Sequence, residues 1–461
     1  MARPIPAKLF ESRFPPALLA AGQRVVDRLA EAGHTAYLAG GCVRDAILER
    51  PIEEIDIATS ATPAQVQALF PATRAVGAHF GVVLVQEGKH QFEVATFRTD
   101  LSYRDGRHPE EVRFSTPEED AERRDFTING MFYDLSARKV IDFVHGMEDL
   151  RRKVIRAIGS PDRRFEEDHL RLIRCVRFAA TLDFRIDLET WEAVRRHAPS
   201  IRDIAVERLQ EELVKGLTRP RASAFLQLLL DSGLLAAVLP EAAAMAGVAQ
   251  PETFHPEGDV FIHVKQMFDE ARYPLTPTLA LGVLLHDVGK PPTFQVRDRI
   301  RFHGHADVGA DMARRILSRL KCSKDVIERV EELVRQHLVF MHVQEMRPSR
   351  LKRFLRQPHF DEHLELHRLD CLGSHRKLGH YDFCRKALRE LPPEVIRPAP
   401  LITGDDLIAL GLKPGPRFKE ILEEIATLQL EDKLKTRDEA IEHVQEKWLG
   451  GPTTPTSNIE R

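Results

Sequence analysis

Two carboxylates separated by one residue follow a pair of glycines near the start of the chain. Residues 40–59 read GGCVRDAILERPIEEIDIAT, with Glu54 and Asp56 in the run EID. Side chains alternate along a strand, so these two carboxylates would share one face. Gly40-Gly41 at a strand-to-helix turn would let backbone N–H groups approach a phosphate. Two acids beside such a turn could hold a pair of Mg²⁺ ions that bridge a triphosphate and an attacking hydroxyl.

A third acid, Glu93, lies in the run FEVATF, which is typical of a neighbouring strand. Each feature alone has a plainer reading, because most GG pairs only make turns and most acids lie on surfaces. Together they favour a nucleotidyl-transfer site with Glu54, Asp56 and Glu93 as its catalytic acids.

A carboxylate and a guanidinium recur three residues apart in EEDHLR. Residues 164–181 have helical periodicity, which predicts that Asp168 and Arg171 point the same way. Asp168 could accept from an exocyclic amino group, and Arg171 could donate to a ring nitrogen. Cytosine and adenine offer that pattern on one edge, whereas guanine and uracil offer its reverse. The pair would therefore select CTP and ATP; the alternative is a surface ion pair.

Histidines and aspartates recur in the second half of the chain. His286-Asp287 ends the apolar run TLALGVLLHDVGKP, and further candidates stand on the segments around it: His263, His305, His337 and Asp370. On successive helices such side chains could converge on one transition-metal centre or on two. Chance scatter of histidine remains the reading for five others: His197, His363, His367, His375 and His380.

Short strand-like runs and helical runs must position these residues. Residues 17–32 predict a helix stopped by Gly33, and TAYLA, IDIAT, GVVLVQEG and HQFEVATFR predict strands. From about residue 150 the pattern is helical. We predict an α+β fold, with a small mixed-sheet head followed by an all-helical neck and body, a helical metal-site domain and a helical tail.

Breaks in these patterns set the expected domain boundaries. PETFHPEGD at 251–259 interrupts the helices, and a group of prolines punctuates residues 392–400. The predicted segments are an N-terminal extension (1–21), the head (22–150), the neck and body (151–250), the metal-site domain (251–395), the tail (396–450) and a disordered C-terminus (451–461).

Composition narrows the class of protein. The chain has 461 residues, 43% hydrophobic and 30% charged, which indicates a globular protein of several domains. It shows no membrane-length apolar run, and its five cysteines form no CxxC pair, which favours a reduced, cytoplasmic protein. Net charge is −3, yet residues 151–221 carry an excess of Lys and Arg. That stripe is either a surface that meets phosphates or an ion-paired helix face.

Four motifs stand in a recognisable order: GGCVRD, IDIATSATP, RRDFTING at 123–130 and EEDHLRLIRCVRFA at 166–179. The chain resembles class II tRNA nucleotidyltransferases and bacterial poly(A) polymerases from about residue 22 to residue 240. The resemblance implies addition of C and A, or of A alone, to tRNA 3′ ends. It implies tRNA or other RNA 3′ ends, CTP and ATP as partners, and no membrane or DNA.

The resemblance also assigns residues. Glu54 and Asp56 are expected to hold Mg²⁺. The expected nucleotide-binding residues are Gly40, Gly41, Arg44, Asp45, Arg124, Asp125, Asn129, Asp168, Arg171 and Arg174. The family's first acid is normally aspartate, and the extra methylene of Glu54 moves its carboxylate by roughly 1.5 Å, a displacement that Mg²⁺ tolerates poorly. We expect the site to be adapted to glutamate.

A polar stretch at 99–116 stands where enzymes that add the full CCA carry a flexible loop, and relatives that add only C have a shorter one. Its polar residues include Arg104, Asp105, Arg107 and His108. The resemblance therefore argues against a C-only enzyme. It leaves CCA addition, A-only addition and poly(A) synthesis open.

HDVGKP resembles the HD phosphohydrolase superfamily. His263, His286, Asp287 and Asp370 match that superfamily's minimal ligands, and His305 and His337 match the extra histidines of some members. Lys290 is a candidate phosphate contact. The resemblance implies a divalent transition metal or Mg²⁺ and hydrolysis of phosphate esters at RNA ends.

Three alternatives stay open beside this two-site RNA 3′-end enzyme. One is a poly(A) polymerase, although a net charge of −3 leans away from a tail-making enzyme. Another is an HD phosphohydrolase whose weakly active head only binds RNA. This alternative stays open because Glu54 replaces the aspartate that is usual in the family. The third is an RNA-binding protein with both sites inactive.

Overall fold

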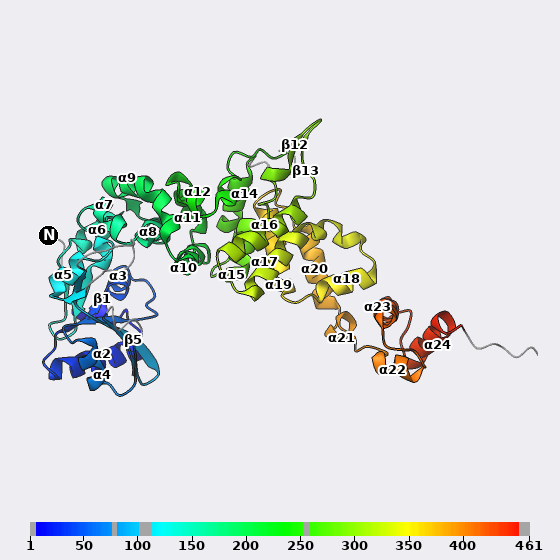
Figure 1. The fold of residues 1–461 in the computed structure, drawn as a ribbon, viewed down its shortest axis with the longest axis horizontal. Coiled ribbons are helices and arrows are strands. Elements are labelled where there is room, and N and C mark those ends of the chain that lie inside the picture. The colour runs from blue at the N-terminus through cyan, green and yellow to red at the C-terminus, as the bar shows by residue number, and fades with distance from the viewer. Residues whose placement is uncertain (1–5, 76–80, 101–111, 252–257, 451–461) are drawn as a thin grey trace, which may run out of the picture.

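The head, the helical body, the metal-site domain and the tail follow one another along the long axis of the molecule (Figure 1). This computed structural model describes residues 6–75, 81–100, 112–251 and 258–450. The predicted disordered C-terminus lies outside the described residues, as does the centre of the polar loop, with Arg104, Asp105, Arg107 and His108. The α+β class predicted from the sequence is confirmed.

A seven-stranded mixed sheet forms the head, in the order β3-β4-β5-β2-β1-β8-β9. Only the β2–β5 pair is parallel, and its register places Asp56 opposite Glu93. The sheet strands are β1 (Ala36–Ala39), β2 (Asp56–Thr59), β3 (Thr73–Ala75), β4 (Val82–Glu87), β5 (His90–Thr96), β8 (Met131–Asp134) and β9 (Lys139–Asp142).

Short helices and three further strands complete the head. Helix α2 ends just before Gly33, whose φ of 84° suits a residue without a side chain. The other elements around the sheet are α1 (Ala7–Glu11), α2 (Pro16–Glu31), α3 (Gly41–Ile47), α4 (Pro63–Leu69), β6 (Arg98–Asp100), β7 (Val112–Phe114), α5 (Pro117–Glu122), η2 (Thr127–Asn129), α6 (Gly146–Arg152) and β10 (Val154–Ile155).

The neck and body are helical, but their helices are shorter than the sequence pattern indicates. The helix predicted over 164–181 is wrong as one piece, because Asp168 has extended backbone between α7 and α8. Farther along the stretch predicted as helical, residues 206–238 form three separate helices. The elements are α7 (Pro161–Glu167), α8 (Leu170–Leu182), β11 (Arg185–Ile186), α9 (Leu188–His197), η3 (Ala198–Asp203), α10 (Val206–Leu217), α11 (Ala222–Asp231), α12 (Leu234–Val238) and α13 (Pro240–Ala243).

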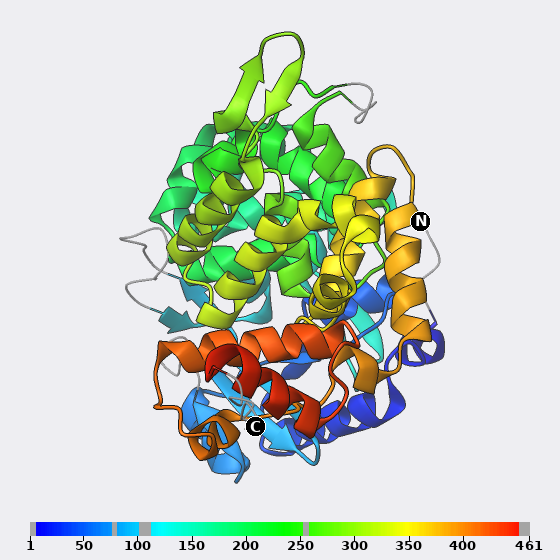
Figure 2. The same cartoon turned by 90° about the vertical axis from the view of Figure 1, so that its right-hand side faces the viewer.

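A bundle of helices forms the next domain, with one hairpin projecting from it (Figures 1 and 2). Asp259 and Thr276 cap the first two helices through side-chain bonds to backbone N–H groups. The elements are α14 (Val260–Asp269), α15 (Pro277–Leu285), η4 (Pro291–Thr293), β12 (Phe294–Val296), β13 (Ile300–Phe302), α16 (His305–Arg319), α17 (Lys324–Gln336), η5 (His337–Glu345), α18 (Pro348–Leu355), α19 (Phe360–Leu372) and α20 (Gly379–Glu390).

One continuous apolar core joins the head, the body and the first helices of this domain, whereas the tail has a core of its own. The tail comprises α22 (Gly404–Ala409), α23 (Pro416–Leu430) and α24 (Arg437–Trp448), whereas α21 (Pro393–Ile396) packs Ile396 into a core of the preceding domain. The buried Lys352 of α18 links the metal-site domain to the tail, because its ammonium donates to Leu430 O of α23 at 2.7 Å. None of the helices in the described ranges is both long and apolar enough to cross a membrane.

Candidate nucleotide site and metal centre

Three carboxylates lie close together near the start of β2, in the middle of the head sheet. Asp56 begins β2 and lies directly across from Glu93 of β5. Glu54 precedes β2 rather than lying in it, and its side chain is exposed. Burial, together with the nearby charges of Glu93 and Glu54, raises the pKa of Asp56 to about 7. A divalent cation would relieve this repulsion, so the donor set suits the Mg²⁺ expected from the sequence.

The glycine turn, Gly40-Gly41, lines the same cavity as these carboxylates. Gly40 has a φ of 68°, and a Cβ there would lie 2.9 Å from Nη1 of Arg124. α3 begins at Gly41 and brings Arg44 back over the turn. Arg44 donates to Asp45 at 2.8 Å and to Asn129 Oδ1 at 2.6 Å. The turn, the arginine and the RRDFTING segment are therefore locked into one arrangement.

Asp125 anchors the RRDFTING segment. It accepts from Arg174 at 2.6 Å and from Asn129 at 3.0 Å. Burial alone would raise its pKa, but Arg174 and Asn129 outweigh that cost and lower it to about 2. The carboxylate is thus charged at neutral pH and holds α8 against the head.

Asp168 and Arg171 do not pair with each other. Arg171 donates to Glu167 at 2.8 Å and to two backbone carbonyls, while Asp168 accepts from Arg208 at 2.9 Å. The expected helical i,i+3 geometry is wrong, because the carboxylate of Asp168 accepts from the N–H of Leu170 and starts α8 instead. Both side chains nevertheless face the same cavity.

A cavity of about 770 Å³ lies between the head and the neck. Every residue predicted for catalysis or nucleotide binding in the head and neck lines it: Gly40, Gly41, Arg44, Asp45, Glu54, Asp56, Glu93, Arg124, Asp125, Asn129, Asp168, Arg171 and Arg174. The cavity is large enough for a nucleoside triphosphate. The structure therefore brings the predicted acids and the predicted base-reading pair into one space.

Other cavity residues had not been predicted. Arg123, Arg208, Glu212 and Arg219 line it as well. Arg123 is the first residue of the RRDFTING motif, so the motif could have pointed to it. Arg208, Glu212 and Arg219 lie in or just after α10, where the sequence has no motif, and only the folded chain brings them to the site.

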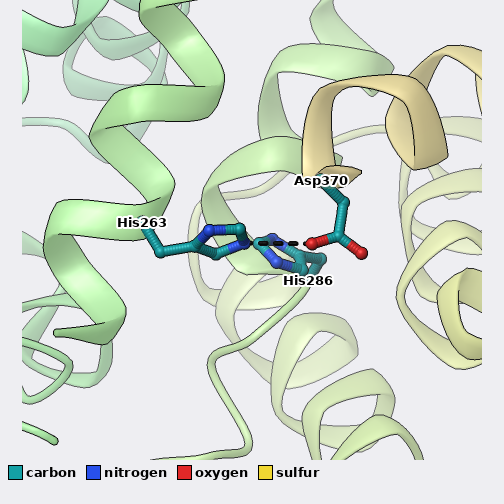
Figure 3. Close-up of side chains that lie close together, drawn as sticks. All are labelled: His263, His286 and Asp370. Atoms are coloured by element: carbon teal, nitrogen blue, oxygen red, sulfur yellow. Dashed lines mark ion pairs between the residues drawn. The ribbon is translucent and has the colours of Figure 1, made fainter. Parts of the chain in front are cut away.

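Six predicted ligands meet in the second domain. His263 of α14 and Asp370 of α19 lie 3.1 Å apart, with His286 beside them (Figure 3). Asp287, His305 and His337 form an adjoining trio, in which the two Nε2 atoms of the histidines are 3.3 Å apart. Within each trio the ligand atoms lie within 4.8 Å of one another. Five helices or helix ends supply them.

The chemistry of this cluster suits a divalent cation. Among the described residues, neither His286 Nε2 nor Asp287 Oδ1 has a hydrogen-bond partner, although both are buried. Burial and the neighbouring His286 lower the pKa of His337 to about 4, which leaves its imidazole neutral and able to bind a metal. The donor set of four imidazoles and two carboxylates suits a divalent cation, and imidazole ligands are typical of transition metals.

Lys290 has protein partners in this structure. Its ammonium lies 2.7 Å from Asp287 and donates to Gln250 at 2.5 Å. It is buried, so its immediate role is to hold Asp287. Of the histidines attributed to chance scatter, His197 pairs with Asp162 and His367 stacks on Phe340, and neither belongs to the two metal trios.

Three stretches match known protein-family models. Residues 36–156 match the poly A polymerase head domain, residues 183–245 match the probable RNA and SrmB-binding site of polymerase A, and residues 263–359 match the HD domain.

The curated relatives bear the name CCA-adding enzyme. The one from Streptococcus uberis is 46% identical over 197 residues, which is 42% of this chain and 49% of that protein. The one from Limosilactobacillus reuteri is 43% identical over 220 residues, 48% and 54% of the two chains. This chain thus spans about half the length of the curated relatives it matches.

Solved structures match nearly the whole chain. The Bacillus stearothermophilus CCA-adding enzyme in complex with CTP is 28% identical with a TM-score of 0.70, over 92% of this chain and 96% of that one. The Thermotoga maritima CCA-adding enzyme complexed with tRNA has a TM-score of 0.61 at 21% identity, over 96% and 98%. The second likeness bears on the fold alone.

Proposed function

We propose that this chain, which carries the head, RNA-binding and HD domains of the poly A polymerase and CCA-adding enzyme family, adds C and A, or A alone, to tRNA 3′ ends from CTP and ATP. The observation that carries the proposal is the single cavity. It holds the acid trio Glu54, Asp56 and Glu93 together with Asp168 and Arg171. A site that only gripped RNA would need neither group.

In the proposed reaction the terminal RNA hydroxyl attacks the α-phosphorus of the triphosphate. A bond forms from the hydroxyl oxygen to phosphorus, the bond to pyrophosphate breaks, and the hydroxyl proton is released. Mg²⁺ held by the acid trio would neutralise charge on the phosphoryl oxygens. In this proposal Arg44 and Arg124, which lie beside the glycine turn, would contact the triphosphate.

Base selection is assigned to two side chains with prepared geometry. Arg171 has five N–H donors and uses three in bonds to the protein, so others remain for a ring nitrogen. Asp168 offers its carboxylate to the exocyclic amino group of cytosine or adenine. Guanine and uracil would present a carbonyl to Asp168, leaving a buried acceptor facing an acceptor.

The HD domain is proposed to hydrolyse phosphate esters at RNA ends. A divalent cation held by the two trios supplies Lewis acidity toward a phosphoryl oxygen and a water. In the balanced reaction water oxygen bonds to phosphorus, one ribose P–O bond breaks, and the ribose oxygen takes up a proton. Such a step would clear a terminal phosphate before nucleotides are added.

The five cysteines, all free thiols, support a cytoplasmic setting.

Nucleotide selection tests the head proposal. A tRNA that ends before CCA would be supplied with each labelled triphosphate and Mg²⁺. We expect incorporation from CTP or ATP and none from GTP or UTP. Asp168→Ala should reduce that selectivity by at least about tenfold. Glu166→Ala, which removes an exposed acid two residues away, is the matched control. Equal use of all four triphosphates by the unaltered enzyme would refute the assignment.

A further inference from the structure

A two-stranded hairpin projects from the HD domain beyond its helices (Figures 1 and 2). It pairs Phe294 with Phe302 and Val296 with Ile300. All three residues of β12 are exposed, with Phe294 41% and Val296 64% accessible. An isolated hairpin of this length is marginal in water, so its exposed apolar side chains call for a partner.

The charge of the hairpin points to the class of that partner. Residues 294–302 read FQVRDRIRF and contain three arginines and one aspartate. Arg301 pairs with Asp298 through both carboxylate oxygens at 2.8 Å. Arg297 and Arg299 at the tip are exposed and keep the net positive charge. An exposed aromatic ring next to arginines is the combination that binds single-stranded nucleic acid through base stacking and phosphate contacts.

The base of the hairpin is part of the wall of the metal centre. Phe302 O accepts from Nδ1 of His305 at 2.9 Å, which leaves Nε2 of that metal-ligand histidine facing the trio. The ring of Phe302 lies 6.4 Å from the ring of His305. Nζ of Lys290 lies 5.5 Å from the centroid of the Phe302 ring. A chain bound along the hairpin would therefore lead to the centre.

We propose that this hairpin is an RNA-binding arm that guides a single-stranded 3′ end to the HD centre. A base stacks on Phe294, and the backbone phosphates meet Arg297 and Arg299. The inference rests on the proposed phosphoesterase and names its substrate class, an RNA chain rather than a free nucleotide. A protein partner is the less favoured occupant, because the apolar side chains are few and interleaved with arginines.

Two substrates with the same reactive group separate the arm from the centre. One is 2′,3′-cyclic AMP, and the other is an RNA oligonucleotide ending in a 2′,3′-cyclic phosphate, each with Mg²⁺ or Mn²⁺. For Arg297→Ala/Arg299→Ala, kcat/KM on the RNA should fall about tenfold or more, and its dependence on salt should weaken. Hydrolysis of 2′,3′-cyclic AMP should stay within about twofold, since both arginines are exposed.

Two further variants test base stacking and control for the loss of positive charge. Phe294→Ala should lower kcat/KM on the RNA alone, because it removes the stacking ring. Arg347→Ala/Arg350→Ala removes two exposed arginines at the start of α18 in the same domain and should leave the hydrolysis of both substrates unchanged. Helix α18 lies away from the hairpin (Figure 1).

Three results would overturn the arm. Unchanged RNA hydrolysis in the hairpin variants would leave the exposed face to a protein partner. Equal losses on both substrates would make the hairpin a mere support of the centre. If the unaltered enzyme hydrolyses neither substrate, the proposed phosphoesterase fails, and binding of the oligonucleotide is measured by fluorescence anisotropy. An unchanged Kd in Arg297→Ala/Arg299→Ala would then overturn the arm independently.

Discussion

Asp168 reaches the nucleotide cavity with its carboxylate already held by Arg208 of α10. This arginine fixes the direction in which the free lone pairs of the carboxylate point. Without it the carboxylate could rotate and accept bonds from a wider range of bases. If Asp168 selects the base as proposed, Arg208 would act as its positioning residue.

Arg208→Ala should lower the preference for CTP over UTP by about tenfold, the effect of losing one charge-assisted hydrogen bond. Competing incorporation of the two nucleotides gives the ratio directly. Arg219→Ala removes another arginine from the same cavity without touching Asp168, so its ratio should stay at the value of the unaltered enzyme. An equal, unselective loss in both variants would reduce Arg208 to a general positive charge.

Glu54 stands where the proteins that this chain resembles normally carry an aspartate. Its carboxylate lies close enough to Asp56 to contribute to the raised pKa of that group, although Glu54 itself stands outside β2. A shorter side chain at the same backbone position would withdraw from the other two acids.

We therefore expect Glu54→Asp to lower kcat for nucleotide addition by about three- to tenfold, because Mg²⁺ requires close octahedral geometry. Single-turnover extension of tRNA measures the chemical step. Glu53→Asp, an exposed neighbour, controls for the shortening itself. A faster Glu54→Asp enzyme would mean that glutamate is a handicap rather than an adaptation.

At the scale of elements, Gly289 lets the turn that follows His286 and Asp287 approach α16 closely. A Cβ on Gly289 would lie 2.1 Å from His305 O and 2.6 Å from Gly309 N. Those neighbours are backbone atoms that cannot rotate away. The contact brings the start of α16, and with it His305, beside Asp287.

Gly289→Ala should push α16 outward, destabilise the domain by about 1–3 kcal/mol and reduce phosphate-ester hydrolysis at least about tenfold. Differential scanning calorimetry and metal-dependent hydrolysis are the two readouts. Gly379→Ala is the control, since a Cβ there meets no atom within 4 Å. Full hydrolysis by Gly289→Ala would show that His305 is not needed at its present position.

The sequence predicted four of the seven strands of the head sheet, β1, β2, β4 and β5, because these carry apolar runs bounded by turn residues; it did not predict β3, β8 or β9. It failed at the junction of α7 and α8. The apolar spacing continues across Asp168, but the carboxylate of Asp168 accepts from the N–H of Leu170 and separates the two helices. It also failed to find Arg208 and Gln250. Each reaches its partner across 40 residues, and no local pattern reports such a contact.

At the scale of the whole molecule, one chain carries two chemically different sites. The acid trio and the proposed base-reading pair, Asp168 and Arg171, line the cavity between head and neck, and the imidazole-rich cluster lies in the next domain. A continuous apolar core connects the two regions, so neither depends on a loose tether.

The two sites should fail separately. Asp56→Ala should abolish nucleotide addition and leave hydrolysis of 2′,3′-cyclic AMP intact, and His286→Ala should do the reverse. Each loss should be at least about a hundredfold, as is usual for removal of a metal ligand or its partner. Parallel assays on the same preparations supply the comparison. Loss of both activities in either variant would point to one shared centre or to misfolding.

The central claim is that the head extends tRNA and stops. Purified protein would be given Mg²⁺, CTP and ATP with a tRNA ending before CCA, a tRNA ending in CC and an unrelated RNA, and the products would be sequenced at their 3′ ends. We predict growth confined to the CCA positions, through CCA on the first tRNA or by one A on the second. Long adenylate tails on every RNA, or no incorporation at all, would contradict it.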